Sequence, residues 1–260
     1  MRKALAAFIL GSSALAGSAA LAATSIDTAG FGLTVGNDGL SGGIGLLSYV
    51  DGTARINLDL SSGEYPVSIT SFQLHGGETL AWSMHQLQSS LSSAFSFDLH
   101  EGYRVTSVTV NGTIFGALDP GIPPAPEPSD TTTDGVVSNP FSITLGHLTA
   151  PGVSTTLDAA AFDSVDGDRA VLVGSDKVFD DDFTLWLATS FKLTTVSGGY
   201  YDYFSPHDFY LQEYLSTATI GIHDLVMTVQ VSQVPEPATW AMLAAGFGLL
   251  SVTARYRRNA

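Results

Sequence analysis

Apolar and polar residues alternate along much of the chain between residues 23 and 233. In Ala54-Arg-Ile-Asn-Leu-Asp-Leu60 every second residue is apolar. A period of two is typical of a β-strand with one buried face, whereas an amphipathic helix repeats every ~3.6 residues. No strong helical pattern occurs between Ala23 and Gln233. We therefore predict that this part of the chain folds as strands.

Strand-like runs recur at short spacing and are separated by glycine-rich turns. Many strands without an alternation of strand and helix favour antiparallel sheets that pack face to face. The prediction is therefore an all-β fold, an antiparallel β-sandwich of jelly-roll type, over residues 23–233. Besides 54–60, the predicted strands are Pro66–Leu74, Leu80–Leu87, Phe95–Leu99, Phe141–Leu148, Ala170–Val173, Phe183–Val196 and Ala218–Val231.

Two dipeptides predict tight hairpins within this pattern. Asp51-Gly52 and Asn111-Gly112 each lie between strand-like residues, and Asp-Gly and Asn-Gly are typical of two-residue hairpin turns. Each turn fixes which residues face each other across the two strands. The predicted pairs are Tyr49 with Ala54, Leu47 with Ile56, and Val108 with Phe115.

A proline-rich segment, residues 119–130, interrupts the strand pattern. Such a sequence is stiff and extended. It either separates two subdomains or forms a surface loop of one domain. We favour one domain, because halves of ~90 residues without disulfides would be small for independent folding.

The charge of the middle of the chain is strongly acidic. Between Ala23 and Val234 five basic residues stand against 24 acidic ones, which gives a net charge of −19. Such a surface repels phosphate backbones, so nucleic-acid binding is disfavoured. The chain contains no cysteine, which excludes disulfides, thiolate metal sites and cysteine nucleophiles.

The N-terminus has the features of a secretory signal peptide over residues 1–22. Arg2 and Lys3 precede an apolar stretch, Ala4 to Leu15, and small residues end in Ala20-Leu21-Ala22. Charge, apolar stretch and cleavage site occur in the order that signal peptidase requires. We therefore predict that the protein is exported and that this segment is removed.

The C-terminus contains an uncharged apolar segment, residues 238–254. Seventeen residues are just long enough to cross ~30 Å of hydrocarbon as a helix. Trp240 lies at its outer rim, and Arg255, Arg257 and Arg258 follow it, which favours a cytoplasmic end. The prediction is a marginal inner-membrane anchor with the β domain outside the cytoplasm.

The motif Pro235-Glu236-Pro237 stands directly before this segment. With the apolar helix and the terminal Arg cluster, residues 234–258 resemble the PEP-CTERM sorting signal of Gram-negative bacteria. The resemblance implies processing near Pro235-Glu236-Pro237 by exosortase, a membrane protease-transpeptidase. It also implies an association with exopolysaccharide or biofilm, at the cell surface or in the extracellular matrix, after transient anchoring in the inner membrane. A second Pro-Glu-Pro, at residues 126–128, lacks the apolar segment and the Arg cluster.

The densest acidic stretch includes Asp163, Asp166 and Asp168. Clustered aspartates in glycine turns supply the hard oxygen ligands that Ca²⁺ binds, although the EF-hand spacing is absent. Asp and Gly are also the ordinary residues of turns. A calcium site and solvated acidic turns therefore both stay open, and no other cofactor is predicted.

The densest aromatic stretch, residues 198–210, is a candidate glycan contact. Tyrosine rings beside carboxylates and imidazoles are suited to sugars, because ring faces stack on C–H groups and polar groups bond hydroxyls. The candidate residues are Tyr200, Tyr201, Tyr203, His207 and Asp208. The alternative is an aromatic loop that packs under itself. Trp82 and Trp186 lie in strand-like runs, and we predict both to be core residues.

The sequence gives little support for catalysis. The six histidines are scattered without an H-E-x-x-H or H-x-H motif, and Gly-x-Ser-x-Gly is absent. We therefore predict a non-enzymatic surface or matrix protein. The alternative is a carbohydrate-binding module or carbohydrate-active enzyme that uses the same export route.

Overall fold

The computed structural model describes residues 25–36, 43–58, 67–70, 84–124, 132–150, 153–205, 208–234, 242 and 245, and of 67–70, 201–205 and 208–211 it describes only the backbone. The predicted signal peptide and, apart from residues 242 and 245, the predicted membrane segment lie outside these residues. Within them the chain forms strands β1 Ser25–Asp27, β2 Phe31–Val35, β3 Ile44–Val50, β4 Thr53–Leu58, β5 Val67–Thr70, β6 Met84–Leu99, β7 Tyr103–Asp119, β8 Thr132–Thr133, β9 Val136–Ser138, β10 Phe141–Ala150, β11 Val153–Phe162, β12 Gly167–Ser175, β13 Phe183–Val196, β14 Gly198–Ser205, β15 Asp208–Tyr214 and β16 Thr217–Gln233.

The strands form two large sheets and one small sheet, and every pairing among the named strands is antiparallel. The first sheet has the order β1-β2-β6-β13-β10-β11, and β9 also pairs with β13. The second has the order β12-β7-β16-β4-β3, and β5 also pairs with β16. The third consists of β15-β14-β8. The predicted all-β, antiparallel fold is confirmed.

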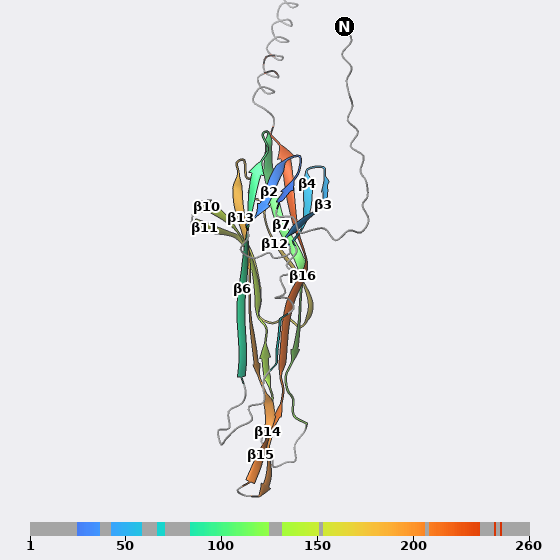
Figure 1. The fold of residues 1–260 in the computed structure, drawn as a ribbon, viewed down its shortest axis with the longest axis vertical. Helices are drawn as coiled ribbons and strands as arrows, with labels where there is room; N and C mark the ends of the chain where they lie inside the picture. Colours follow the sequence, from blue (N-terminus) through green and yellow to red (C-terminus); the bar gives the residue numbers. More distant parts are fainter. Residues whose placement is uncertain are drawn as a thin grey trace, which may run out of the picture.

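Four long strands set the shape of the molecule. β6, β7, β13 and β16 have 16, 17, 14 and 17 residues, and they run along the long axis in Figure 1. At one end, the upper end in Figure 1, the shorter strands widen both large sheets. At the other end the β14–β15 hairpin extends beyond them. The result is an elongated β body with two different ends.

The hydrophobic core lies between the inner faces of the two large sheets. Along β13 every second residue from Phe183 to Thr195 is buried, and the residues between them are only partly buried or exposed. The core includes alternating residues of β7 and β16 in the same way, among them Val108, Val110, Val229 and Met227. The period of two in the sequence therefore indicates which residues of each strand face the core.

The Asp51-Gly52 turn is present, but the register beyond it is shifted. Both residues have positive φ angles, 48° and 75°, as a two-residue hairpin turn of this kind requires. Tyr49 pairs with Ala54 as predicted, whereas Ile56 pairs with Leu46 because a β-bulge intervenes. The predicted pairing of Leu47 with Ile56 is therefore wrong, and Leu47 is 56% exposed.

The predicted Asn111-Gly112 hairpin is wrong, because β7 runs straight through these residues. Asn111 pairs with Leu172 of β12 on one side and with Val226 of β16 on the other. β16 has an irregularity between His223 and Val226 at this level. A Cβ atom on Gly112 would lie 2.8 Å from Leu225 Cδ2 and 3.2 Å from the His223 carbonyl oxygen. Gly112 therefore allows β16 to pack closely at its irregularity, and it does not form a turn.

Candidate functional site

The acidic residues Asp163, Asp166 and Asp168 lie where the chain crosses from β11 in the first sheet to β12 in the second. All three are exposed. Among the residues that the structure describes, no group of three His, Cys, Asp or Glu side chains is arranged to hold a metal ion. The sequence-predicted calcium ligands are therefore neighbours in a turn, but the structure does not bring their carboxylates together into one site.

A buried asparagine fixes the conformation of this turn. Asn139 is fully buried, and its Nδ2 donates to the carbonyl oxygens of Val165, at 2.6 Å, and Thr219, at 2.9 Å. The Val165 N–H donates in return to Asn139 Oδ1 at 2.8 Å. Val165 itself is buried in the core between the exposed aspartates. The side chain of Asn139 therefore holds the crossing turn against β16.

The predicted aromatic loop is a β-hairpin at the end of the molecule. β14 and β15 pair with each other, with Tyr201 opposite Leu211 and Tyr203 opposite Phe209. The rings of Tyr200 and Tyr214 stack with centroids 6.2 Å apart. Asp208 begins β15, and His207 lies outside the described residues. The glycan contacts predicted here stay a prediction.

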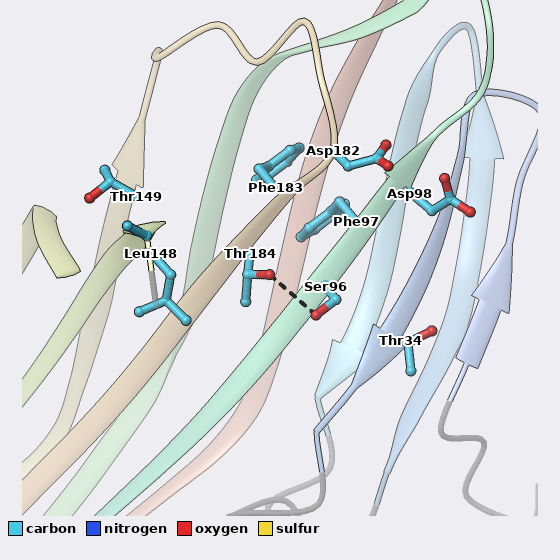
Figure 2. Close-up of a pocket in the computed structure, with 10 residues that line it drawn as sticks. Thr34, Ser96, Phe97, Asp98, Leu148, Thr149, Asp182, Phe183 and Thr184 are labelled. Atoms are coloured by element: carbon cyan, nitrogen blue, oxygen red, sulfur yellow. Dashed lines mark hydrogen bonds between the residues drawn. The ribbon is translucent and has the colours of Figure 1, made fainter. Parts of the chain in front are cut away.

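A groove of about 530 Å³ crosses the outer face of the first sheet near its wide end (Figure 2). The cross-strand register places four of its residues in one row, one each from β2, β6, β13 and β10: Thr34, Ser96, Thr184 and Leu148. The Ser96 and Thr184 hydroxyls lie 3.3 Å apart and share a hydrogen bond. This row is therefore rich in hydroxyls, whereas Leu148, Ala150 and the two phenylalanines Phe97 and Phe183 give the groove an apolar part.

Two carboxylates stand at one side of this row. Asp98 and Asp182 are both exposed and line the groove (Figure 2). The Leu99 N–H donates to Asp182 Oδ1 at 2.8 Å, which orients that carboxylate. Beside them the rings of Phe97 and Phe183 stack in the core, 4.5 Å apart and nearly parallel. Phe97 precedes Asp98 on β6, and Phe183 follows Asp182 at the start of β13, so this aromatic pair lies directly beside both carboxylates.

Trp186 lies on the outer face of the same sheet, so its predicted place in the core is wrong. It alternates with the buried Leu185 and Leu187, and its side chain is partly exposed. Its cross-strand neighbour on β10 is Gly146. A Cβ atom on Gly146 would lie 2.2–2.4 Å from three indole atoms, Cε2, Nε1 and Cζ2. The indole therefore lies across the glycine, and the strand period alone would have placed it outside.

His147 of β10 lies beside Lys177 and Phe179, in surroundings that disfavour its protonation. Lys177 Nζ donates to His147 Nδ1 at 3.2 Å, and the His147 ring meets the edge of Phe179 at 5.0 Å. Burial and, to a smaller extent, the charge of Lys177 lower the pKa of His147 below its ordinary value of 6.5. Both causes act against the imidazolium.

The chain leaves the β body at its wide end. β16 ends at Gln233, whose Nε2 donates to Tyr103 Oη at 3.1 Å, and the Val234 N–H donates to the Gly102 carbonyl at 2.8 Å. The predicted sorting residues that follow lie outside the described part of the chain: Pro235, Glu236, Pro237, Trp240, Arg255, Arg257 and Arg258. Within the described part, no helix has the length and apolar character needed to cross a membrane.

Two solved structures show a weak likeness to the chain. They are structures of infectious bursal disease virus, Gt strain and Gx strain, each with 12% sequence identity and a TM-score of 0.19. The matches cover 92% and 95% of this chain, and 59% and 70% of the viral chains. The chain thus spans 59% of the first viral chain, and a TM-score this low does not show a shared fold. No curated protein matches the chain.

The C-terminal segment has a clear match. Residues 233–258 match the family model of the PEP-CTERM protein-sorting motif. The match begins at Gln233, the last residue of β16, and includes the Pro-Glu-Pro sequence, the apolar segment and the Arg cluster. The resemblance predicted for this end of the chain is confirmed. The chain therefore carries a PEP-CTERM sorting motif and is an exported protein targeted to exosortase.

Proposed function

We propose that the chain is a non-enzymatic surface or extracellular-matrix protein that associates with exopolysaccharide after exosortase processing. The observation that carries this proposal is the position of the sorting motif, which begins where β16 ends, at one end of an elongated β body. A protein held by such a tail extends the rest of its length away from the attachment point. This geometry suits display and spacing in a matrix.

The remaining parts of the chain fit the same route. Signal peptidase would remove residues 1–22, and residues 238–254 would anchor the protein in the inner membrane until exosortase acts. The two large sheets, as a jelly-roll-like sandwich within residues 23–233, would form the delivered domain. With 24 acidic and five basic residues between Ala23 and Val234, the delivered domain carries a net negative charge that favours solubility at neutral pH.

The test is to replace Pro235-Glu236-Pro237 by three alanines and follow the protein in its native host. The variant is expected to stay uncleaved in the inner membrane, because alanines let the apolar helix extend into a site that the two prolines keep open to a protease. Mass spectrometry of the extracted protein gives both termini and any attached glycan.

The chain offers a matched control in its second Pro-Glu-Pro, at residues 126–128. The same triple replacement there keeps the sorting tail intact, so processing is expected to match the wild type. Normal cleavage and release of the 235–237 variant would contradict the proposal, as would an equal defect in the two variants.

A carbohydrate-active enzyme is the second candidate, because Asp98 and Asp182 line the same groove. Glycoside hydrolases commonly use two carboxylates on either side of the scissile bond. Incubation of the mature protein with host exopolysaccharide, followed by a reducing-sugar assay, separates the candidates. Sugar release that Asp98→Asn and Asp182→Asn abolish would establish the enzyme and overturn the non-enzymatic proposal.

A further inference from the structure

We infer that the outer face of the first sheet binds an uncharged polysaccharide chain. Trp186 would stack on its sugar rings, and the adjacent groove would form hydrogen bonds with its hydroxyls. The inference rests on the proposed association with exopolysaccharide and gives it a site. It assigns that contact to the wide end of the molecule rather than to the tyrosine-rich hairpin. Three properties of the described residues carry it: the indole, the hydroxyl row and the charge.

The indole of Trp186 is a flat aromatic group on the outer face of the sheet. Cε2, Nε1 and Cζ2 all lie 2.2–2.4 Å from the Cβ position of Gly146, so this part of the ring packs directly on that residue. The side chain is partly exposed, so part of the ring is open to a ligand. Flat aromatic faces of this kind stack on the apolar C–H faces of sugar rings.

Stability alone does not favour tryptophan at this position. Its Nε1–H is buried and has no hydrogen-bond acceptor within the part of the chain that the structure describes. A buried donor without a partner costs free energy, and phenylalanine or leucine would cover Gly146 without that cost. Tryptophan is the residue that gives the largest flat face, which is what a stacking ligand uses.

The groove supplies hydrogen-bonding groups on the neighbouring row. Thr184 is two residues before Trp186 on β13, a separation of about 7 Å along the strand. The row from Thr34 to Leu148 crosses four adjacent strands, roughly 14 Å at ~4.8 Å per strand. An oligosaccharide segment of a few sugar units laid across the strands would contact the row and the indole together.

Charge selects the class of polysaccharide. Asp98 and Asp182 at the side of the groove accept hydrogen bonds from sugar hydroxyls. The same two carboxylates, on a domain whose net charge between Ala23 and Val234 is −19, repel a chain of uronic acids. No Lys or Arg lines the groove among the described residues. The ligand is therefore an uncharged glycan rather than an anionic one.

Affinity electrophoresis of the mature protein from the host tests this site. The gels contain either the uncharged fraction of the host exopolysaccharide or its anionic fraction. We expect retardation by the uncharged fraction only. Trp186→Ala is expected to weaken the apparent Kd about tenfold, equivalent to about 1.4 kcal/mol, because the aromatic contact is lost. Thr184→Val, which keeps a β-branched side chain but removes the hydroxyl, is expected to weaken it about fivefold.

Two further variants control for folding. Trp186→Phe keeps an aromatic face and removes the unsatisfied N–H, so it should fold at least as stably and retain most of the retardation. Ser190→Ala changes the same outer face further along β13 and should bind like the wild type. Circular dichroism melting of each variant shows which ones are folded. If Trp186→Ala does not fold, the binding of Trp186→Phe and Thr184→Val tests the proposed site instead.

The outcomes separate this inference from the proposed function. No retardation by the uncharged fraction, or unchanged retardation of folded Trp186→Ala and Thr184→Val, would overturn the site while leaving exosortase processing and matrix location intact. Stronger retardation by the anionic fraction would also overturn it. A protein that is not processed at residues 235–237 would instead contradict the proposed function, whatever the gels show.

Discussion

At the scale of single residues, the side chain of Asn139 stabilises the crossing turn through three hydrogen bonds. It is a fully buried amide that donates twice and accepts once, and two of these bonds hold the backbone of Val165. Asn139→Ala would leave the buried N–H and carbonyl of Val165 without this partner. We expect a loss of about 2–4 kcal/mol in the free energy of unfolding.

Urea unfolding of the purified protein measures this loss. Asp163→Ala is the matched control, because it alters the same turn at an exposed position and is expected to change stability by less than about 0.5 kcal/mol. If the two variants unfolded at the same urea concentration, the asparagine would not be what holds the crossing turn.

His147 makes stability depend on pH in a definite direction. Burial and Lys177 lower its pKa in the folded state, so below the ordinary pKa the unfolded chain binds the proton more readily than the folded one. The free energy of unfolding therefore falls as the pH drops through 6.5 towards the lowered folded pKa. His147→Gln still accepts a bond from Lys177 but cannot take up a proton in this range.

The measurement is the melting temperature of both proteins between about pH 7.5 and about pH 5. The two proteins differ only at residue 147, so the difference between the curves isolates His147. The wild type should lose more stability than the variant on acidification. Parallel curves would show that the imidazole is not kept neutral by its surroundings.

At the scale of elements, the period-two pattern predicted the bounds of single strands and which residues of a strand face the core. β13 has the bounds predicted from alternation, Phe183–Val196, and Asp51-Gly52 forms the predicted turn. The same alternation, read strictly, separates Trp186 from the buried Leu185 and Leu187. Its contact with Gly146 required the cross-strand register, which the sequence of one strand does not contain.

The failures share one physical cause, the influence of strands that are distant in the sequence. Asn111-Gly112 has strong local turn preference, but β12 and β16 pair with it on both sides and the bulge of β16 fills the space above Gly112. The groove likewise combines residues of β2, β6, β13 and β10, which are far apart in the chain. No local sequence motif indicates that these residues line one groove, so the groove could be identified only from the order of the strands in the sheet.

At the scale of the whole molecule, the two ends are chemically different and far apart. The sorting motif begins beside the turn between β6 and β7, at the wide end, and the β14–β15 hairpin forms the opposite end (Figure 1). β13 and β14 have 14 and 8 residues, which in line span roughly 70 Å at ~3.3 Å per residue. The polysaccharide site proposed on the outer face lies near the tail, and the hairpin is the part that extends outward.

This length is open to direct measurement, because the chain has no cysteine and engineered ones can be labelled selectively. Glu101→Cys, in the turn next to the exit of the chain, is paired with Asp208→Cys at the start of β15. Single-molecule energy transfer between dyes at these positions should be low, as expected for roughly 70 Å along two strands in line. Glu101→Cys with Asp27→Cys is the control, since Asp27 bonds His100 beside the same turn and its dye pair should transfer with high efficiency. High transfer in both pairs would mean that the hairpin folds back along the body, and display at the end opposite the tail would then be wrong.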